Sequence, residues 1–419
     1  MPAARTIACL LLLGVVSVEV ASAVFGGIAP HQVALRMLGL TPGWSLFAYC
    51  VAVAAPPLRV SLFKTALVLS GLGLAVDLAV GLVGTQSPIW WAGLGLGASP
   101  LLCLGSAFIR RGGREAALVD HSAAASVLYL SSLMMPFFLF QTTQWFPTVM
   151  DPGIAFADEA LAGFQPSGLV ALAFAKSDVL RVSSSLVYGF LPVAVAAVAG
   201  FEARSGASRD AGVLPTFLTA ALLGYACYAL MPTIGPRAFF GEAFPLMNAS
   251  GTILETRPTV DFDPTHFRNA VPSLHVTWAA LALLACRGRS VPACILMSVF
   301  LAFTIIATLG LGEHYLVDLV VAAPFLLVVR AACSIRVSRY SPERLGGLVV
   351  GSALLALWVW HIRSGDLSGV SSSFVTVFSV VTVGLSVWLE LTLFRSEKRV
   401  PGAAPLVAPE TPLSEGAQG

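Results

Sequence analysis

Two histidines and one aspartate have the types and spacing to perform chemistry together. His275 stands at the start of an apolar segment in "PSLHV", and His314 stands at the start of another in "GEHYLVDLV". Asp318 follows His314 by four residues, which on a helix places both side chains on one face within hydrogen-bonding reach. A carboxylate that holds one ring nitrogen of a histidine makes the other nitrogen more nucleophilic. The spacing therefore predicts an activated histidine.

The residues around His275 are suited to binding an anion. Pro272 fits the first position of a helix, where its missing N–H costs nothing. The N–H groups that follow, together with the Ser273 hydroxyl, would then point outward and could receive a phosphate. His275 lies one turn into this helix and could protonate a leaving oxygen. Arg237 and Arg268 flank the segment, and either could clamp phosphate oxygens in a bidentate manner.

The composition indicates that these residues sit in a membrane protein. The chain has 419 residues, of which 57% are hydrophobic and 11% charged, whereas soluble domains carry about 25% charged residues. Long apolar runs such as "LVVGSALLALWVW" do not alternate, so helices are favoured over a β-barrel. We expect membrane lipids as partners and no nucleic acid.

Hydropathy predicts an all-α integral membrane protein with about twelve spans, each near the roughly 20 residues needed to cross a bilayer. The predicted spans lie near 6–26, 40–56, 64–84, 88–109, 122–146, 183–201, 212–231, 273–286, 291–311, 315–333, 346–362 and 370–394. The first could also be a signal peptide ending in Ala-Ser-Ala, but Glu19 interrupts it, and we expect a retained helix.

Lysine and arginine in short loops predict the orientation. With these spans the basic clusters all fall on one side, which should be the cytoplasm, together with both termini. The clusters are Arg110, Arg111 and Arg114; Arg204 and Arg209; Arg287 and Arg289; Arg336, Arg339 and Arg344; and Arg395, Lys398 and Arg399. Loops 147–182 and 232–272 then face outward from the plasma (cytoplasmic) membrane. The first of these loops contains an expected amphipathic surface helix, 167–185.

We therefore expect the active site to face outward from the plasma membrane. The outward loops also hold basic residues, although lysine and arginine usually gather on the cytoplasmic side. These residues are Lys176, Arg181, Arg237, Arg257 and Arg268. Three of these five flank the polar cluster at His275, which gives weight to an anionic ligand. The tail from Val400 is rich in proline, alanine and glycine and is expected to be disordered.

"PSLH" followed by "HYLVD" resembles the type 2 phosphatidic acid phosphatase superfamily. The form is most similar to the branch of the inositol phosphorylceramide synthases, which reads PSLH and HYxxD where the classical branch has PSGH. "FPTVMDPGIAFADEALAGFQPS" also resembles the loop after the first core helix of that branch. The resemblance covers 122–333 and implies a six-helix catalytic core there. It leaves N-terminal transmembrane helices at 1–121, a C-terminal helical pair at 334–399 and a disordered tail at 400–419.

The resemblance also implies roles for the site residues. His314 would be the nucleophile that forms a phosphohistidine, and Asp318 would orient it. His275 would protonate the leaving alcohol and then activate the acceptor, while Ser273 would help to hold the phosphate. The sequence departs from the classical pattern in two places. Ala307 and Thr308 stand where the classical third motif has Ser-Arg, and "GPR", with Arg237, stands in for the classical first motif of a lysine and Arg-Pro.

The sequence thus predicts a membrane-embedded phosphatase or phosphotransferase acting on a lipid phosphate or phosphodiester. Water as acceptor would give a phosphatase, and an alcohol such as inositol would give a head-group transferase. No metal or cofactor is expected, because histidine and arginine supply the nucleophile and the positive charge. Two alternatives stay open. A polyprenyl-phosphate-dependent glycosyltransferase would use an acidic pair, here Asp158 and Glu159, to bind a metal, and a proton-coupled transporter would use Asp77, Asp318 and the histidines as a relay.

Overall fold

The computed structural model describes most of the chain from residue 145 onward and parts of the N-terminal region. The described ranges are 41–54, 56–80, 95–103, 145–204, 212–246, 260–261, 266–287, 290–365 and 371–399, with isolated positions before 145. The predicted spans at 6–26 and 122–146 lie largely outside these residues, as does the tail at 400–419. Asp77 lies in a described helix, but its side chain is outside the description.

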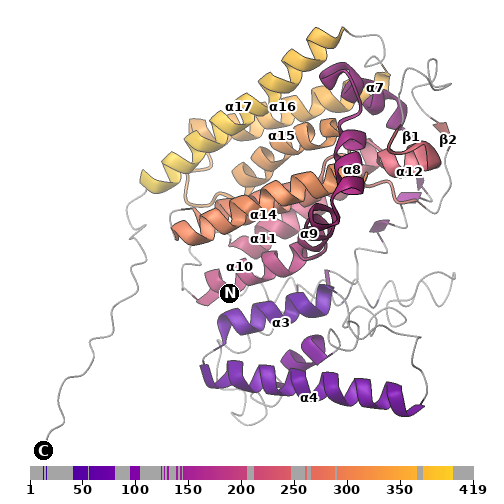
Figure 1. The fold of residues 1–419 in the computed structure, drawn as a ribbon. Coiled ribbons are helices and arrows are strands. Elements are labelled where there is room, and N and C mark those ends of the chain that lie inside the picture. The colour runs from indigo at the N-terminus through magenta and orange to yellow at the C-terminus, as the bar shows by residue number, and fades with distance from the viewer. Residues whose placement is uncertain are drawn as a thin grey trace, which may run out of the picture.

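The described chain is predominantly helical (Figure 1). Its helices are α3 (Thr41–Val53), α4 (Pro56–Val80), α7 (Asp151–Ala162), α8 (Pro166–Lys176), α9 (Asp178–Gly189), α10 (Leu191–Arg204), α11 (Val213–Leu230), α12 (Pro236–Phe240), α13 (Leu274–Cys286), α14 (Val291–Gly310), α15 (Leu316–Cys333), α16 (Pro342–Ser364) and α17 (Ser372–Arg399). A 3-10 turn, η1 (Gly241–Ala243), follows α12. Strands β1 (Thr148–Val149) and β2 (Val260–Asp261) pair in antiparallel fashion.

Five described helices, α11 and α14 to α17, are long and apolar enough to cross a membrane. The bent pair α9 and α10 would make a sixth if it counts as one span, and α8, α13 and Trp44–Val53 are shorter apolar helices. These helices support an integral membrane protein of the all-α class. The predicted number of twelve spans is not confirmed.

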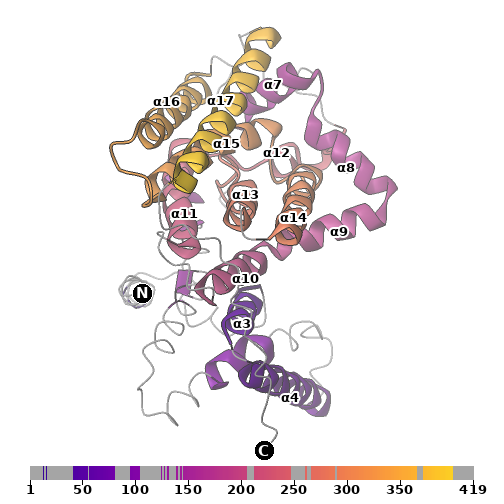
Figure 2. The ribbon, with the colours of Figure 1, turned by 90° about the vertical axis from the view of Figure 1, so that its left-hand side faces the viewer.

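Helix α13 is the central element of the bundle. It packs against α10, α11, α14 and α15, and Figure 2 shows it between α11, α14 and α15. Residues such as Leu274, Ala279 and Phe325 are buried in the apolar cluster that joins these helices. Helices α16 and α17 cover the outer side of α15. The start of α13, where His275 lies, is thereby held inside the bundle.

The loops gather at the two ends of this bundle. One end holds the starts of α13 and α15 and the end of α14, with α7 and α12 beside them (Figure 1). The other end holds the described basic clusters, because Arg204 ends α10, Arg287 follows α13, and Arg336 lies between α15 and α16. The candidate site and the basic clusters therefore lie at opposite ends, as the charge distribution predicts.

The described N-terminal helices lie to one side of the bundle and attach to it through α10 (Figure 1). The contact is close at Gly200, where an added Cβ atom would lie 2.6 Å from the Cβ of Ala52 and 2.9 Å from the carbonyl oxygen of Tyr49. A side chain at this position would push α3 away from α10. Glycine is therefore the residue that allows the N-terminal helices to dock.

The prediction of one amphipathic helix over 167–185, in the first long loop, is wrong. This loop contains three helices, α7, α8 and α9, and the break between α8 and α9 falls at Ser177. The Ser177 hydroxyl accepts a hydrogen bond from the Leu180 N–H, so this residue caps a new helix rather than continuing the old one. Helix α9 then meets α10 at a 51° bend, which interrupts the predicted span at 183–201.

Candidate active site

His314 and Asp318 form a buried pair where α14 meets α15. The Nδ1 atom of His314 lies 3.3 Å from Oδ2 of Asp318, and the two residues are 3% and 0% exposed. The same carboxylate oxygen accepts the Tyr315 N–H at 2.8 Å. His314 precedes the first helical residue of α15, so the pair is built by the helix start rather than by one helix face. The predicted contact is present, with a carboxylate holding one ring nitrogen.

The turn that carries His314 is fixed by the end of α14. The carbonyl of Thr308 accepts the N–H groups of both Glu313 and His314, at 3.1 and 3.2 Å. Burial lowers the pKa of His314 to about 4, although the neighbouring Glu313 carboxylate and a hydrogen bond with the Ala270 backbone both raise it. The imidazole is therefore neutral at neutral pH, which is the form that can act as a nucleophile.

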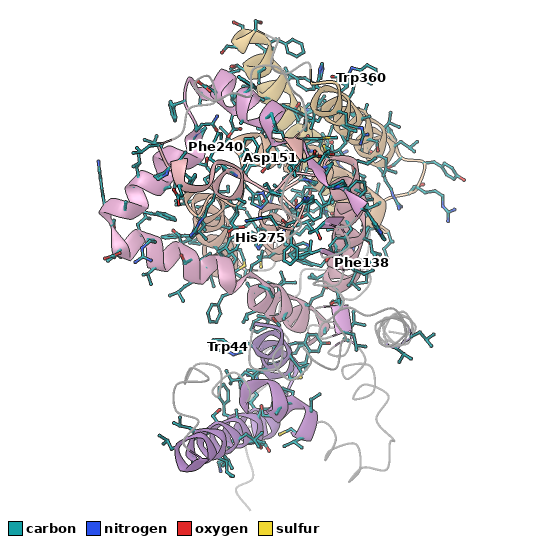
Figure 3. All side chains as sticks on the ribbon, turned by 90° about the vertical axis from the view of Figure 1, so that its right-hand side faces the viewer. Trp44, Phe138, Asp151, Phe240, His275 and Trp360 are labelled. Atoms are coloured by element: carbon teal, nitrogen blue, oxygen red, sulfur yellow. The ribbon has the colours of Figure 1, made fainter. Side chains whose placement is uncertain are left out.

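His275 lies beside His314 although 39 positions separate them in the sequence. The centroids of the two rings are 6.1 Å apart at an interplanar angle of 63°. Figure 3 shows His275 inside the bundle at this end. Among the described residues, none forms a hydrogen bond with the His275 ring. The two histidines that the sequence singled out thus lie together, at one end of the bundle.

Tyr188 is a site residue that the sequence did not reveal. It lies in the last turn of α9 and stacks on the His275 ring, with centroids 4.0 Å apart and planes 16° from parallel. Its segment reads as an amphipathic surface helix, and nothing in that pattern marks a tyrosine that contacts a histidine more than 80 positions away. The stacking fixes the plane of the His275 ring.

Replacing Tyr188 should lower activity without changing the chemistry. Tyr188→Ala removes the stacked ring, and since aromatic pairs contribute about 0.5–1.5 kcal/mol, we expect kcat to fall by about 2- to 10-fold. Tyr188→Phe keeps the stacking and should retain near wild-type activity. Steady-state assays of both purified variants check this, and equal losses in the two would assign the effect to the hydroxyl instead.

Ser273 begins α13 and lies next to the His314–Asp318 pair. Its buried hydroxyl accepts the Val276 N–H at 3.4 Å, and its own N–H donates to the Asp318 carbonyl at 3.3 Å. Because the capping residue is Ser273, Pro272 precedes the cap. The prediction that Pro272 occupies the first helical position is therefore wrong. Ser273 sets where α13 begins and so places His275; its contact with phosphate stays a prediction.

The two candidate arginines differ in what their guanidinium groups contact. Arg268 is fully buried, and its side chain donates to the carbonyls of Phe146 at 3.0 Å, Pro147 at 3.2 Å and His266. This arginine ties the chain before β1 to the chain before α13. Arg237 is exposed, and within the described residues no hydrogen bond or ion pair engages its guanidinium. The guanidinium of Arg268 therefore anchors a loop, and that of Arg237 is exposed to solvent. Phosphate binding by either arginine stays a prediction.

Two glycines hold Arg237 close to the turn that carries His314. The Arg237 N–H donates to the Gly312 carbonyl at 2.9 Å, and an added Cβ at Gly312 would lie 2.6 Å from the Cβ of Arg237. Gly235 has a φ of +86°, and a Cβ there would lie 2.3 Å from the Glu313 carbonyl oxygen. The backbones on either side of the site thus approach more closely than side chains would allow.

Gly235→Ala should therefore destabilise the protein and displace this contact. The added methyl group meets backbone, and the positive φ is unfavourable for alanine, so we expect a loss of about 2 kcal/mol in the free energy of unfolding. Thermal unfolding in detergent measures the loss. Gly189→Ala is the matched control, because no atom lies within 4 Å of its Cβ position and its backbone is helical. An equally stable Gly235→Ala protein would contradict the close approach.

Two buried aspartates of α7, Asp151 and Asp158, also reach the site. Both oxygens of Asp158 accept backbone N–H groups at the start of α15, and Asp151 accepts bonds from Ile234, Gly235 and Tyr315. Burial raises the pKa of Asp151 to about 7 and that of Asp158 to about 8, against the lowering effect of these bonds. The sequence offered Asp158 as one of a metal-binding pair with Glu159, but its oxygens are engaged by the backbone instead.

Comparison with known proteins agrees with this geometry. A family model described as the PAP2 superfamily matches residues 154–332, from α7 to the end of α15. The match contains Ser273, His275, His314 and Asp318, and it supports the type 2 phosphatidic acid phosphatase superfamily, whose members are generally phosphatases or phosphotransferases. No curated protein and no solved structure matches the chain. The apolar helices and this match support an integral membrane protein of the phosphatase-type superfamily, and the match does not select a branch within it.

Proposed function

We propose that this protein transfers the phosphoryl or phosphodiester group of a lipid through a phosphohistidine on His314. The observation that carries the proposal is the pairing of His314 with Asp318 beside the His275 ring, whose centroid lies 6.1 Å from that of His314. With Nδ1 donating to Asp318, the Nε2 atom of His314 holds the lone pair that attacks phosphorus. The exposed guanidinium of Arg237 balances charge on the phosphate oxygens.

The reaction proceeds in two displacements. As the bond from His314 to phosphorus forms, the bond from phosphorus to the leaving oxygen breaks, and protonated His275 donates its proton to that oxygen. An anionic phosphate beside both rings favours the protonated form of His275. Water or an alcohol then gives its proton to His275 and attacks phosphorus, which breaks the bond to His314 and restores the neutral nucleophile. Atoms and protons balance over the cycle.

The distribution of basic residues supports an outward-facing site. The site lies at the end of the bundle opposite Arg204, Arg287 and Arg336, and basic residues favour the cytoplasm. The site would then face outward and take a lipid from the outer leaflet. The acceptor decides the class of enzyme: water gives a phosphatase, and an alcohol such as inositol gives a transferase of the kind found in the inositol phosphorylceramide synthase branch.

Product analysis tests this function. Purified protein in mixed micelles is incubated with dioctanoyl phosphatidic acid or dioctanoyl phosphatidylinositol, with and without a ceramide or diacylglycerol acceptor, and the products are identified by mass spectrometry. Free phosphate from phosphatidic acid defines a phosphatase, and a new phosphodiester on the acceptor defines a transferase. Absence of both from a panel that extends to other lipid phosphates would contradict the proposal.

A further inference from the structure

The start of α15 is held by a carboxylate from another helix. Oδ2 of Asp158 accepts the Leu316 N–H, and Oδ1 accepts the Val317 N–H, both at 2.7 Å. These are the first two helical residues of α15, whose N–H groups have no partner within the helix. They stand between His314 and Asp318 in the sequence. The carboxylate therefore fixes the backbone that sets the distance between the nucleophile and its orienting group.

A second carboxylate of the same helix holds the other side of the site. Asp151 accepts the Gly235 N–H at 3.0 Å and the Ile234 N–H at 3.0 and 3.2 Å. The loop that these bonds fix leads directly to Arg237. Asp151 also accepts the Tyr315 hydroxyl at 3.1 Å, and Tyr315 follows His314 in the chain. One short helix thus contacts both loops that line the site.

Helix α7 is itself anchored in the bundle. Ile154, Ala155 and Ala157 are fully buried, and the helix packs against α15 and α17. The Ser372 hydroxyl at the start of α17 donates to the Ala160 carbonyl. The seven-residue spacing of Asp151 and Asp158 places both carboxylates on one face of α7. Figure 3 shows Asp151 within the bundle at the same end as His275. The two carboxylates are therefore attached to a packed element and not to a loop.

We propose that Asp158 and Asp151 are positioning residues for phosphoryl transfer, which hold the His314 turn and the Arg237 loop in reacting geometry through their backbone N–H groups. This inference rests on the proposed function. Both oxygens of Asp158 are occupied by N–H groups, so it acts through the backbone rather than on the phosphate. Reacting atoms must lie about 3–3.5 Å apart and in line, and a misplacement of about 1 Å costs about 100-fold in rate.

Asp158→Asn is the direct test. The amide keeps the shape of the side chain but turns an NH₂ group toward one of the two backbone N–H groups, so one acceptor is lost. We expect kcat per folded molecule to fall about 10- to 100-fold, with KM changed by less than about 3-fold, because the substrate contacts remain. The assay uses the dioctanoyl lipid on which the wild-type protein is active.

Glu202→Gln is the matched control. Glu202 is also a buried carboxylate that accepts a helix N-terminal N–H, that of Val213 in α11, but it lies at the end of the bundle away from the site. Both variants should lose thermal stability, while Glu202→Gln keeps the wild-type kcat. A purely structural role for Asp158 would leave kcat per folded molecule equal in the two variants, and that result would overturn the inference.

Tyr315→Phe decides the matter if Asp158→Asn does not fold. It removes only the hydroxyl that donates to Asp151, and we expect a kcat about 3- to 10-fold lower with KM unchanged; an unchanged kcat would overturn the inference. Failure of the positioning role can be distinguished from failure of the proposed function. If neither the wild-type protein nor its variants turn over any phosphate ester, the proposed function fails. If the wild type turns over substrate through His314 and the Asp158→Asn and Tyr315→Phe variants match its kcat, only the positioning role fails.

Discussion

His314→Ala should reduce turnover by about 10⁴-fold or more while the protein remains folded. The substitution removes the atom that forms the bond to phosphorus, and loss of a covalent nucleophile in enzymes of comparable design has effects of this size. Asp318 would be left without its histidine partner, yet it still accepts the Tyr315 N–H, so the start of α15 keeps its cap. The measurement is kcat with the preferred lipid substrate, normalised to folded protein by size-exclusion chromatography.

His266→Ala provides the control for this experiment. His266 is an exposed histidine before α13, and its side chain takes no part in the proposed chemistry. Its substitution should leave kcat within about 2-fold of the wild type, since surface changes away from special features have small effects. Activity that survives in the folded His314→Ala protein would remove the nucleophile from the mechanism.

His275→Ala should separate the two chemical steps. With a lipid substrate, whose leaving alkoxide is strongly basic, loss of the general acid is expected to lower the rate of the first step by about 10²- to 10⁴-fold. A p-nitrophenyl phosphate ester needs no proton on its leaving group, so the first step should be nearly unaffected. The second step still lacks its base. We therefore expect a burst of one nitrophenolate per active site, followed by slow turnover.

Rapid mixing with absorbance detection measures this burst. The wild-type protein should show faster steady turnover with the same compound, because His275 is present to activate water. The contrary outcome is equal slowing of lipid and p-nitrophenyl substrates in the first step. That result would make His275 a residue of binding or folding rather than a proton donor.

The histidine pair could be predicted because its signal is local. His314 and Asp318 lie four residues apart, and His275 follows a helix start signal, so short sequence patterns were enough to identify them. The apolar spans at α11 and α13 to α17 were predictable for the same reason. The predicted position of Pro272 in the helix was wrong, because proline and serine are both common at helix N-termini. Only the hydrogen bond from the Val276 N–H to the Ser273 hydroxyl shows that Ser273 is the capping residue.

The positioning residues could not be predicted because their contacts are long-range. Asp158 accepts hydrogen bonds from Leu316 and Val317, which lie 158 and 159 positions further along the chain. Asp151 accepts one from Tyr315, 164 positions further along. In the sequence these aspartates belong to a predicted loop, and no local pattern indicates that the segment forms a buried helix. Arg268 shows the converse. Its place beside the PSLH motif suggested a phosphate ligand, but carbonyl groups from a distant segment engage its guanidinium.

The most direct test of the mechanism is to trap the phosphorylated histidine. The His275→Ala protein, which should accumulate the intermediate, is mixed with the p-nitrophenyl ester and quenched in base, and its peptides are mapped by mass spectrometry. The account predicts one phosphoryl group per protein on His314, stable in base and lost in acid. The double variant that carries both His275→Ala and His314→Ala should show no such group. A burst of nitrophenolate without modification of His314, or with modification of another residue, would contradict it.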